Sequence, residues 1–342
     1  MVAGRNSLNQ AFESPKRMDL LIIEPLEAEV TEWLRARYEL RCAPDLASDP
    51  RAFRQALYNV RALIAPPAVM LDAQTLHHAP ELRAVGRVSA GAENIDLDAC
   101  LRARVEVVRS PTATAQAEAE FMMGALLSML RRVPVNGSDG MRVGRELGCA
   151  TVGLIGMAPA ARAMAQMLGG FGSKIVGYDP SLHASDPVFE RWRVAPLGLR
   201  ELLEQSDAVC VQLNYFSRYH GLLGGRFLAF CKPDQVLVSI AHSGLFDESA
   251  LADALRTGRI KAAWLDSLEP GVLDPGRPLF GVENLQVTPR LASTTRESRL
   301  RSAWAVVRRI DELLTPAAAA PRAFSAAAPG VPIDPAAAPL RQ

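Results

Sequence analysis

The sequence predicts an α/β protein with two domains, each built around a parallel sheet. Its 342 residues exceed the size of one ordinary domain. Short apolar strands alternate with helical segments along most of the chain, which is the pattern of parallel sheets. Near the middle, Thr151–Ala161 has the order strand, glycine turn and helix, and a further strand then ends at Asp179. This order is typical of doubly wound dinucleotide-binding domains.

The first half of the chain opens with residues 1–17, whose polar, aperiodic sequence predicts a flexible tail. Apolar or alternating runs then predict four strands, at 20–23, 38–42, 60–66 and 82–88. A long apolar-periodic helix follows Pro111 and covers 114–132. Asn136–Gly140 has the composition of a turn.

The second half continues the alternation after the glycine turn. Strands are predicted at 208–213, 235–240, 261–266 and 285–288, with a helix at 247–257 that Gly258 ends. The last helix is expected to begin at Thr294, with Glu297 completing a capping box, and to end near Leu314. The Ala/Pro-rich residues 316–342 predict a disordered or polyproline-like tail.

Composition and charge limit the classes of binding partner and indicate the cellular compartment. A net charge of +1 argues against a nucleic acid or an anionic membrane as the main partner. The five cysteines are scattered without a CxxC pair, which favours a reduced cytoplasmic protein and predicts no metal site. The N-terminus has no apolar segment typical of a signal peptide, and residues 121–130 are too short to span a bilayer.

The glycine turn indicates a dinucleotide site in altered form. The three glycine positions of the fingerprint are Gly156, Ala158 and Ala161. Ala158 adds a methyl group where a diphosphate would lie, and Pro159 removes one N–H from the anion-binding end of the helix. Asp179 could accept hydrogen bonds from a ribose, which favours NAD over NADP. A turn that has kept its fold and lost its nucleotide is the alternative interpretation.

From about Leu20 to Leu314, the sequence resembles the D-isomer-specific 2-hydroxyacid dehydrogenase family. The resemblance implies a flavodoxin-like substrate domain formed by 18–113 and 293–315. A Rossmann-like NAD-binding domain would cover 114–292. The matching segments are Gly86–Asp96, Gly144–Leu147, Tyr178–Pro180, Lys232–Pro233, Ala241–Glu248, Leu265–Pro270 and Val287–Ala292.

The resemblance also implies an activity and a set of site residues. The family reduces small 2-keto acids with NADH, in a cleft between the two domains, and a homodimer is a possible assembly. The positions implied for NAD are Gly156, Ala158, Pro159, Ala160, Asp179, Asn214, Ala241 and Asp266. Those implied for the acid substrate are Ser89, Ala90 and Gly91, with Ser89 where the family usually has glycine.

The catalytic positions depart from the family pattern. His242 stands where the family has the arginine that binds the substrate carboxylate, and Arg290 stands where it has the proton-donating histidine. Gly271 replaces the glutamate that supports this histidine, and Glu269 is a carboxylate two residues earlier. One hypothesis is an exchanged pair, in which Arg290 binds the carboxylate, His242 supplies the proton and Glu269 supports one of them. The other is that these positions drifted after catalysis was lost.

Three functions therefore remain open. The first is an NAD-dependent oxidoreductase that acts on a small 2-keto, 2-hydroxy or related acid with a rebuilt acid/base site. The second is a catalytically inactive relative that senses dinucleotides or binds proteins. The third is an elimination or isomerisation supported by His242 without hydride transfer.

Overall fold

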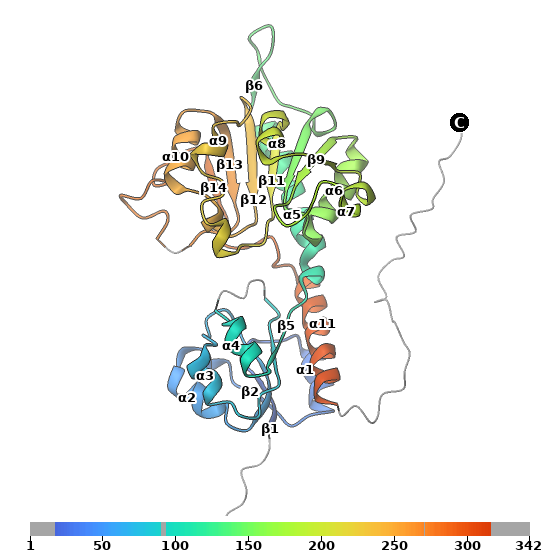
Figure 1. The fold of residues 1–342 in the computed structure, drawn as a ribbon, viewed down its shortest axis with the longest axis vertical. Helices are drawn as coiled ribbons and strands as arrows, with labels where there is room; N and C mark the ends of the chain where they lie inside the picture. Colours follow the sequence, from blue (N-terminus) through green and yellow to red (C-terminus); the bar gives the residue numbers. More distant parts are fainter. Residues whose placement is uncertain (1–17, 90–93, 270, 316–342) are drawn as a thin grey trace, which may run out of the picture.

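The computed structural model describes residues 18–89, 94–269 and 271–315, and two parallel sheets dominate it. The first has the strand order β2-β1-β3-β4-β5, which is the flavodoxin-like order. It lies in the lower half of Figure 1. Its strands are β1 (Met18–Ile22), β2 (Leu40–Cys42), β3 (Val60–Ile64), β4 (Ala84–Gly86) and β5 (Glu106–Val108).

The second sheet has the order β10-β9-β8-β11-β12-β13-β14. This is the doubly wound order with one more strand at the far edge, and the order reverses between β8 and β11. The predicted fold class, two Rossmann-like domains, is therefore confirmed. The strands are β8 (Thr151–Ile155), β9 (Lys174–Tyr178), β10 (Ala195–Pro196), β11 (Ala208–Val211), β12 (Gln235–Ser239), β13 (Ile260–Leu265) and β14 (Leu285–Val287).

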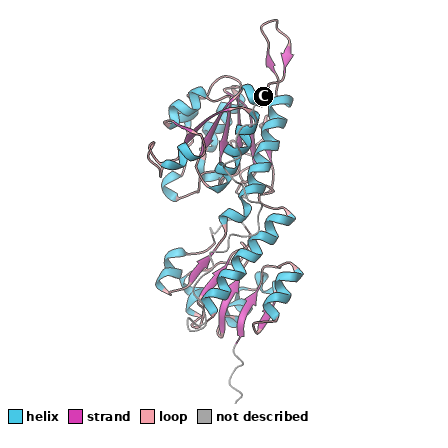
Figure 2. Cartoon of the chain, turned by 90° about the vertical axis from the view of Figure 1, so that its right-hand side faces the viewer, coloured by secondary structure: helices cyan, strands magenta, loops and turns pink. Residues whose placement is uncertain are grey.

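Helices cover the faces of both sheets (Figure 2). Around the first sheet these are α1 (Ala28–Arg35), η1 (Pro44–Ser48), α2 (Pro50–Ala56), α3 (Ala73–His77), α4 (Leu97–Arg102) and α11 (Arg296–Leu314). The long α5 (Pro111–Arg132) leads to the second sheet. That sheet carries η2 (Leu147–Cys149), α6 (Pro159–Phe171), α7 (Pro187–Arg191), α8 (Leu199–Gln205), η3 (Ser217–Tyr219), α9 (Gly225–Leu228), η4 (Ser243–Leu245) and α10 (Glu248–Arg256).

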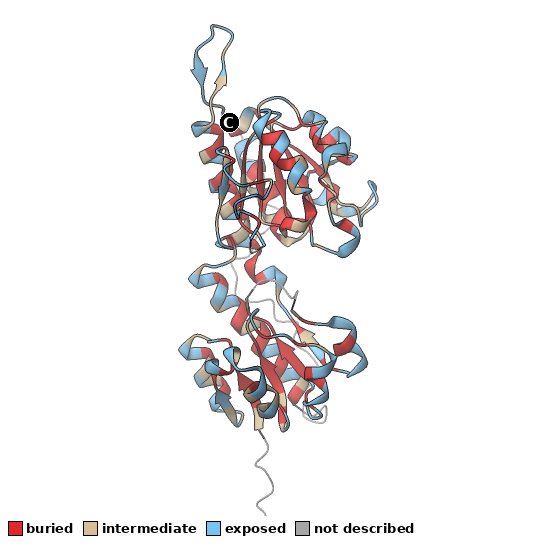
Figure 3. Cartoon of the chain, turned by 90° about the vertical axis from the view of Figure 1, so that its left-hand side faces the viewer, coloured by how far each residue is buried: buried red, intermediate tan, exposed pale blue. Residues whose placement is uncertain are grey.

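Helix α11 returns from the second sheet and packs on the first. In Figure 3 the buried residues, in red, gather on the strands at the centre of both sheets. Val306, Val307 and Ile310 are fully buried against the β-strand side chains. The helix approaches β4 so closely that a Cβ atom on Gly86 would lie 2.6 Å from Val306 Cγ1. Helix α11 thus completes the core on one face of the first sheet.

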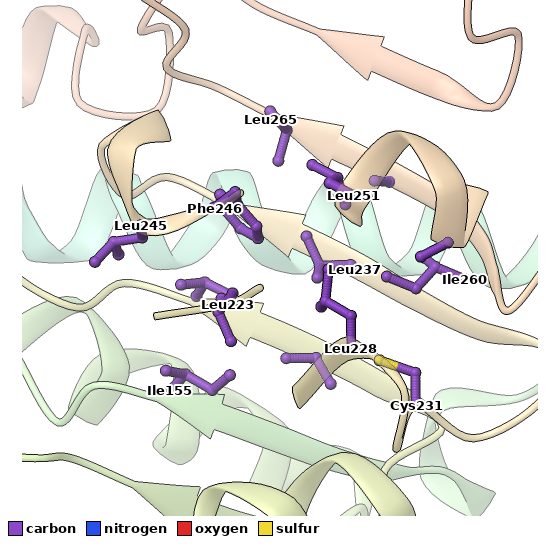
Figure 4. Packing of buried hydrophobic residues seen from close by; sticks show 14 of the residues in the cluster. Ile155, Leu223, Leu228, Cys231, Leu237, Leu245, Phe246, Leu251, Ile260 and Leu265 are labelled. Carbon is purple, nitrogen blue, oxygen red and sulfur yellow. The ribbon is translucent and has the colours of Figure 1, made fainter. Parts of the chain in front are cut away.

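The core of the second domain fills the space between its sheet and helices α8 to α10 (Figure 4). Strands β8, β12 and β13 supply Ile155, Leu237 and Leu265, and α10 supplies Leu251. Burying such side chains contributes about 1.5–3 kcal/mol each, so this cluster fixes the strand ends from which the site residues project.

Two local details correct or extend the sequence prediction. The N-cap of α11 is Thr295, whose Oγ1 accepts a hydrogen bond from Ser298 N at 3.1 Å, and not Thr294. The predicted turn at 136–140 closes a short antiparallel hairpin of β6 (Val135–Asn136) and β7 (Arg142–Val143), which projects from the second domain in Figure 1. Across the described ranges, no helix combines the length and apolarity needed to cross a bilayer.

We predict that Gly86→Ala destabilises the protein by about 1–3 kcal/mol, because the new methyl group overlaps Val306 and Ile310. Gly169→Ala, at an exposed position of α6, is the matched control, since nothing lies within 4 Å of its added Cβ. This control should be neutral or stabilise by up to about 1 kcal/mol. Urea unfolding of both variants measures the difference, and equal midpoints would contradict the close packing of α11 on β4.

Candidate functional site

The predicted site residues of the second domain all follow strand ends on the carboxyl edge of its sheet. Ligands of doubly wound sheets bind at this edge, where the strand order reverses. Gly156 follows β8, Asp179 follows β9, Asn214 follows β11, Ala241 and His242 follow β12, Asp266 and Glu269 follow β13, and Arg290 follows β14. Parallel strands thus place residues that are up to 134 positions apart in the sequence along one edge of the sheet.

The glycine turn requires its one remaining glycine. Gly156 has φ +96°, and a Cβ there would lie 2.8 Å from the backbone of Leu213 at the end of the neighbouring strand. Ala158 is the N-cap of α6 and Pro159 its first residue, and no side chain caps this helix. The first N–H groups of a helix have no intrahelical partner, so the positive end of α6 is available to an anion.

Asp179 holds the glycine turn in place. Its Oδ2 accepts a hydrogen bond from Met157 N at 2.8 Å, and its Oδ1 accepts from Ser181 N and Oγ at 2.9 and 2.6 Å. A carboxylate offers about four acceptor positions, so one remains for a ribose hydroxyl. Asn214 is exposed beside this region, and Ala241 is buried with its N–H donated to Ser239 Oγ.

His242, Glu269 and Arg290 come together around one carboxylate oxygen. Glu269 Oε1 lies 2.9 Å from His242 Nε2 and 3.8 Å from Arg290 Nη2. His242 Nδ1 accepts a hydrogen bond from Gly244 N at 3.0 Å, which assigns the ring hydrogen to Nε2. The imidazole is therefore held at both nitrogens, and the sequence alone left open which partner Glu269 reaches.

The ring of Tyr215 stacks on His242, with centroids 4.3 Å apart and planes at 16°. Its hydroxyl lies 3.2 Å from His220 Nδ1. The stacking restrains the imidazole in the plane that the Gly244 and Glu269 contacts require. Sequence reasoning did not identify Tyr215 as a site residue, although it directly follows Asn214, which was assigned to the cofactor.

Asp266 shapes the turn that carries Arg290. Its buried carboxylate accepts hydrogen bonds from Thr288 Oγ1, Leu291 N and Ala292 N, at 2.6 to 2.9 Å. Its backbone carbonyl accepts from Arg290 N at 2.6 Å. Arg290 has φ +54°, a conformation that disfavours non-glycine residues and persists where neighbouring contacts over-determine it. In this conformation Asp266 positions Arg290, whereas the sequence assigned it to the cofactor.

Glu118 on α5 is a second carboxyl group that sequence reasoning missed. Burial raises its pKa, a hydrogen bond with Thr114 opposes the shift, and the nearby charge of Asp266 adds to it. Thr114 and Glu118 are four residues apart, on the same face of α5 as the buried Ala115 and Ala119. A lone acid on an apolar helix face is the signal that could have identified it.

The first domain contributes the loop after β4. Ser89 N donates to Glu24 Oε1 at 3.0 Å, and Val88 N to Glu24 Oε2 at 3.4 Å. Glu24 is 5% exposed and follows β1, so it holds the start of the predicted substrate loop. Of the three residues predicted to bind substrate, Ser89 lies here, while Ala90 and Gly91 fall outside the described residues.

Comparison with known proteins finds relatives of this chain by sequence and by fold. Residues 126–292 match the family model described as "D-isomer specific 2-hydroxyacid dehydrogenase, NAD binding domain". The (S)-sulfolactate dehydrogenase of Chromohalobacter salexigens is 31% identical over 304 residues, covering 86% of this chain and 98% of that protein. The D-3-phosphoglycerate dehydrogenase of Mycobacterium bovis is 33% identical over 257 residues, which is 72% of this chain and 48% of the relative.

The solved structure of D-mandelate dehydrogenase from Rhodotorula graminis has the same fold, with a TM-score of 0.73. It is 22% identical and the match covers 88% of this chain and 98% of that one. The strand orders, the glycine turn and the two full-length likenesses agree. The chain therefore belongs to the D-isomer-specific 2-hydroxyacid dehydrogenase family of NAD-binding oxidoreductases.

Proposed function

We propose that this protein is an NAD(H)-dependent oxidoreductase for a small 2-keto/2-hydroxy acid or a related acid. In this proposal His242, Glu269 and Arg290 form its altered acid/base site. The observation that supports this most directly is the shared Glu269 oxygen, 2.9 Å from His242 Nε2 and 3.8 Å from Arg290 Nη2.

The residues present fit NAD. The uncapped N-terminus of α6 would face the diphosphate, and the tight turn at Gly156 would bring the backbone near it. Asp179 would use its remaining acceptor position for a ribose hydroxyl, and Asn214 and Ala241 lie further along the same sheet edge, after β11 and β12. When bound, NAD donates or accepts the hydride.

Arg290 is the candidate to bind the substrate carboxylate. Its guanidinium stays protonated and can bind a carboxylate through two nitrogens. The side chain is 43% exposed, so an acid arriving from solvent can reach it. Glu269 offers a carboxylate to the same guanidinium, which makes it an internal competitor that the substrate would have to displace.

His242 is the candidate proton donor. Its Nε2 hydrogen points to Glu269 Oε1, and a substrate carbonyl oxygen that takes the place of Oε1 would receive the same hydrogen bond. In the neutral ring Nδ1 accepts from Gly244 N, so proton transfer requires that Nδ1 first loses this hydrogen bond and takes up a proton from solvent. The resulting imidazolium would then give its Nε2 proton to that oxygen, complete the alcohol and return to the neutral ring, while Tyr215 keeps the imidazole oriented and Glu269 moves aside.

A second candidate is a catalytically inactive relative that senses dinucleotides or binds proteins. The same contacts favour it, because in this structure Glu269 already engages both catalytic candidates. The methyl of Ala158 and the missing N–H of Pro159 also weaken the anion site at α6. Turnover separates the two functions.

We also propose a cytoplasmic homodimer. All five cysteines are unpaired, which agrees with a reducing compartment. The hairpin of β6 and β7 exposes Met141 in its turn and Val143 on β7, and such projecting apolar residues are suited to contact a second copy.

We predict that His242→Ala lowers kcat for the reduction of 2-keto acids by about 10²–10⁴-fold, the usual contribution of a general acid. NADH affinity should stay within about twofold by calorimetry, because His242 lies outside the glycine turn. His183→Ala is the matched control, since His183 is an exposed histidine that contacts Ser185. Wild-type turnover in His242→Ala would rule out the exchanged pair.

We predict that Asp266→Asn raises KM for the acid by about tenfold or more. The new amide group would face the N–H of Leu291 or Ala292, or the Thr288 hydroxyl, and release the turn that holds Arg290. Steady-state kinetics with Asp253→Asn, an exposed aspartate on α10, provide the comparison. An unchanged KM would show that Arg290 does not depend on this turn.

A further inference from the structure

A small cavity lies where the end of β4, the start of α5 and the start of α11 meet. Its volume is about 40 Å³, roughly three times what one water molecule needs by the same measure. Ser89 and Thr114 line one side, and Ser298 and Ser302 line the other. Thr294 and Arg299, both exposed, form the rim.

Three of the lining hydroxyl groups are buried and have no hydrogen-bond partner among the described residues. These are the Oγ atoms of Ser89, Ser298 and Ser302. Ser298 is 0% exposed and Ser302 2% exposed, although both belong to a helix whose other face is in solvent. A buried hydroxyl without a partner is unfavourable, so three of them around one cavity indicate a bound group that satisfies them.

The electrostatics of the cavity favour a group with negative charge. It lies at the N-terminus of α11, a 19-residue helix whose dipole places positive charge there. Arg299 adds a guanidinium at the rim, where it contacts Glu27 Oε1 at 3.4 Å and the carbonyl of Pro25 at 3.3 Å. Three acidic side chains lie close by. The N–H groups of Val88 and Ser89 bind the Glu24 carboxylate, Glu27 pairs with Arg299, and Glu118, whose pKa is raised by burial, hydrogen-bonds Thr114.

We propose that this cavity is an oxyanion-binding site that takes a sulfate, phosphate or sulfonate group. The three serine hydroxyls would donate hydrogen bonds to its oxygens, and the α11 terminus and Arg299 would balance its charge. Bonds from neutral donors to an ionised acceptor are stronger than neutral pairs, which suits hydroxyls that have no other partner. The site is separate from the oxygen shared by His242 and Arg290, and it binds whether or not turnover occurs.

The same chemistry can come from two sources. One is a free inorganic anion, and the other is the second acidic group of an organic acid whose carboxylate binds elsewhere. The cavity begins three residues after Arg290, at Ser293, so an extended acid could reach both places. Inorganic sulfate and 3-phosphoglycerate are the probes that distinguish these sources.

The test compares wild type with the double variant Ser298→Ala/Ser302→Ala. Without sulfate, the double variant should melt at or above wild type, because it removes two unpaired buried hydroxyls. Sulfate, exchanged for chloride at constant ionic strength, should stabilise wild type more. Its apparent affinity should fall by about tenfold or more in the double variant.

Ser206→Ala is the matched control, because Ser206 is also fully buried but its hydroxyl donates to Leu202 O at 2.6 Å. It should lower the melting temperature and leave the sulfate response unchanged. A serine-dependent response to 3-phosphoglycerate but not to sulfate assigns the site to an organic acid. If neither probe distinguishes the double variant from wild type, the cavity does not bind oxyanions and the proposal is wrong.

Discussion

The carboxylate of Asp266 is the interaction on which the candidate site depends. It is 3% exposed and ties the end of β13 to the turn after β14 through three hydrogen bonds. Together with the hydrogen bonds that Arg290 N donates to the backbone carbonyls of Asp266 and Thr288, it holds Arg290 in a left-handed backbone conformation. Because Arg290 and Glu269 leave the two strands on either side of this bond, Asp266 also sets the distance between them.

The exchange of histidine and arginine changes how the site is supported. In the family pattern a carboxylate supports a histidine after the last strand, whereas here the histidine follows β12 and Glu269 reaches it across the sheet edge. Tyr215 and the Gly244 N–H restrain the ring from its other sides. The result is an imidazole with a defined tautomer beside an exposed guanidinium. Once the imidazole takes up a second proton, these are the two groups that carbonyl reduction of an acid requires.

Most of the fold could be predicted from the sequence because its signals are local. Runs such as Leu20–Ile23 and Val209–Val211 are apolar enough to predict buried strands. The turn at position 156 has a positive φ, which explains why glycine stands there. Features that depend on packing could not be predicted. Whether Thr294 or Thr295 caps α11 depends on where its first turn lies, since each hydroxyl offers the same chemistry.

The candidate site likewise has some features that the sequence predicts and others that depend on packing. The identities of His242, Glu269 and Arg290 followed from the resemblance, but their meeting at one oxygen depends on side-chain directions after three different strands. Glu118, Tyr215 and the unpaired hydroxyls of Ser298 and Ser302 became visible only with burial and neighbours known. The sequence does not show whether a serine on an apolar helix face has a hydrogen-bond partner.

The central claim is that a rearranged site still performs hydride transfer to an acid. It is tested most directly with NADH carrying deuterium at the transferred position of its nicotinamide, incubated with 2-keto acids with and without a second acidic group. If the rearranged site transfers hydride, the product is a 2-hydroxy acid with one deuterium at C2. The contradicting result would be NADH that binds to the protein while no deuterium enters any product.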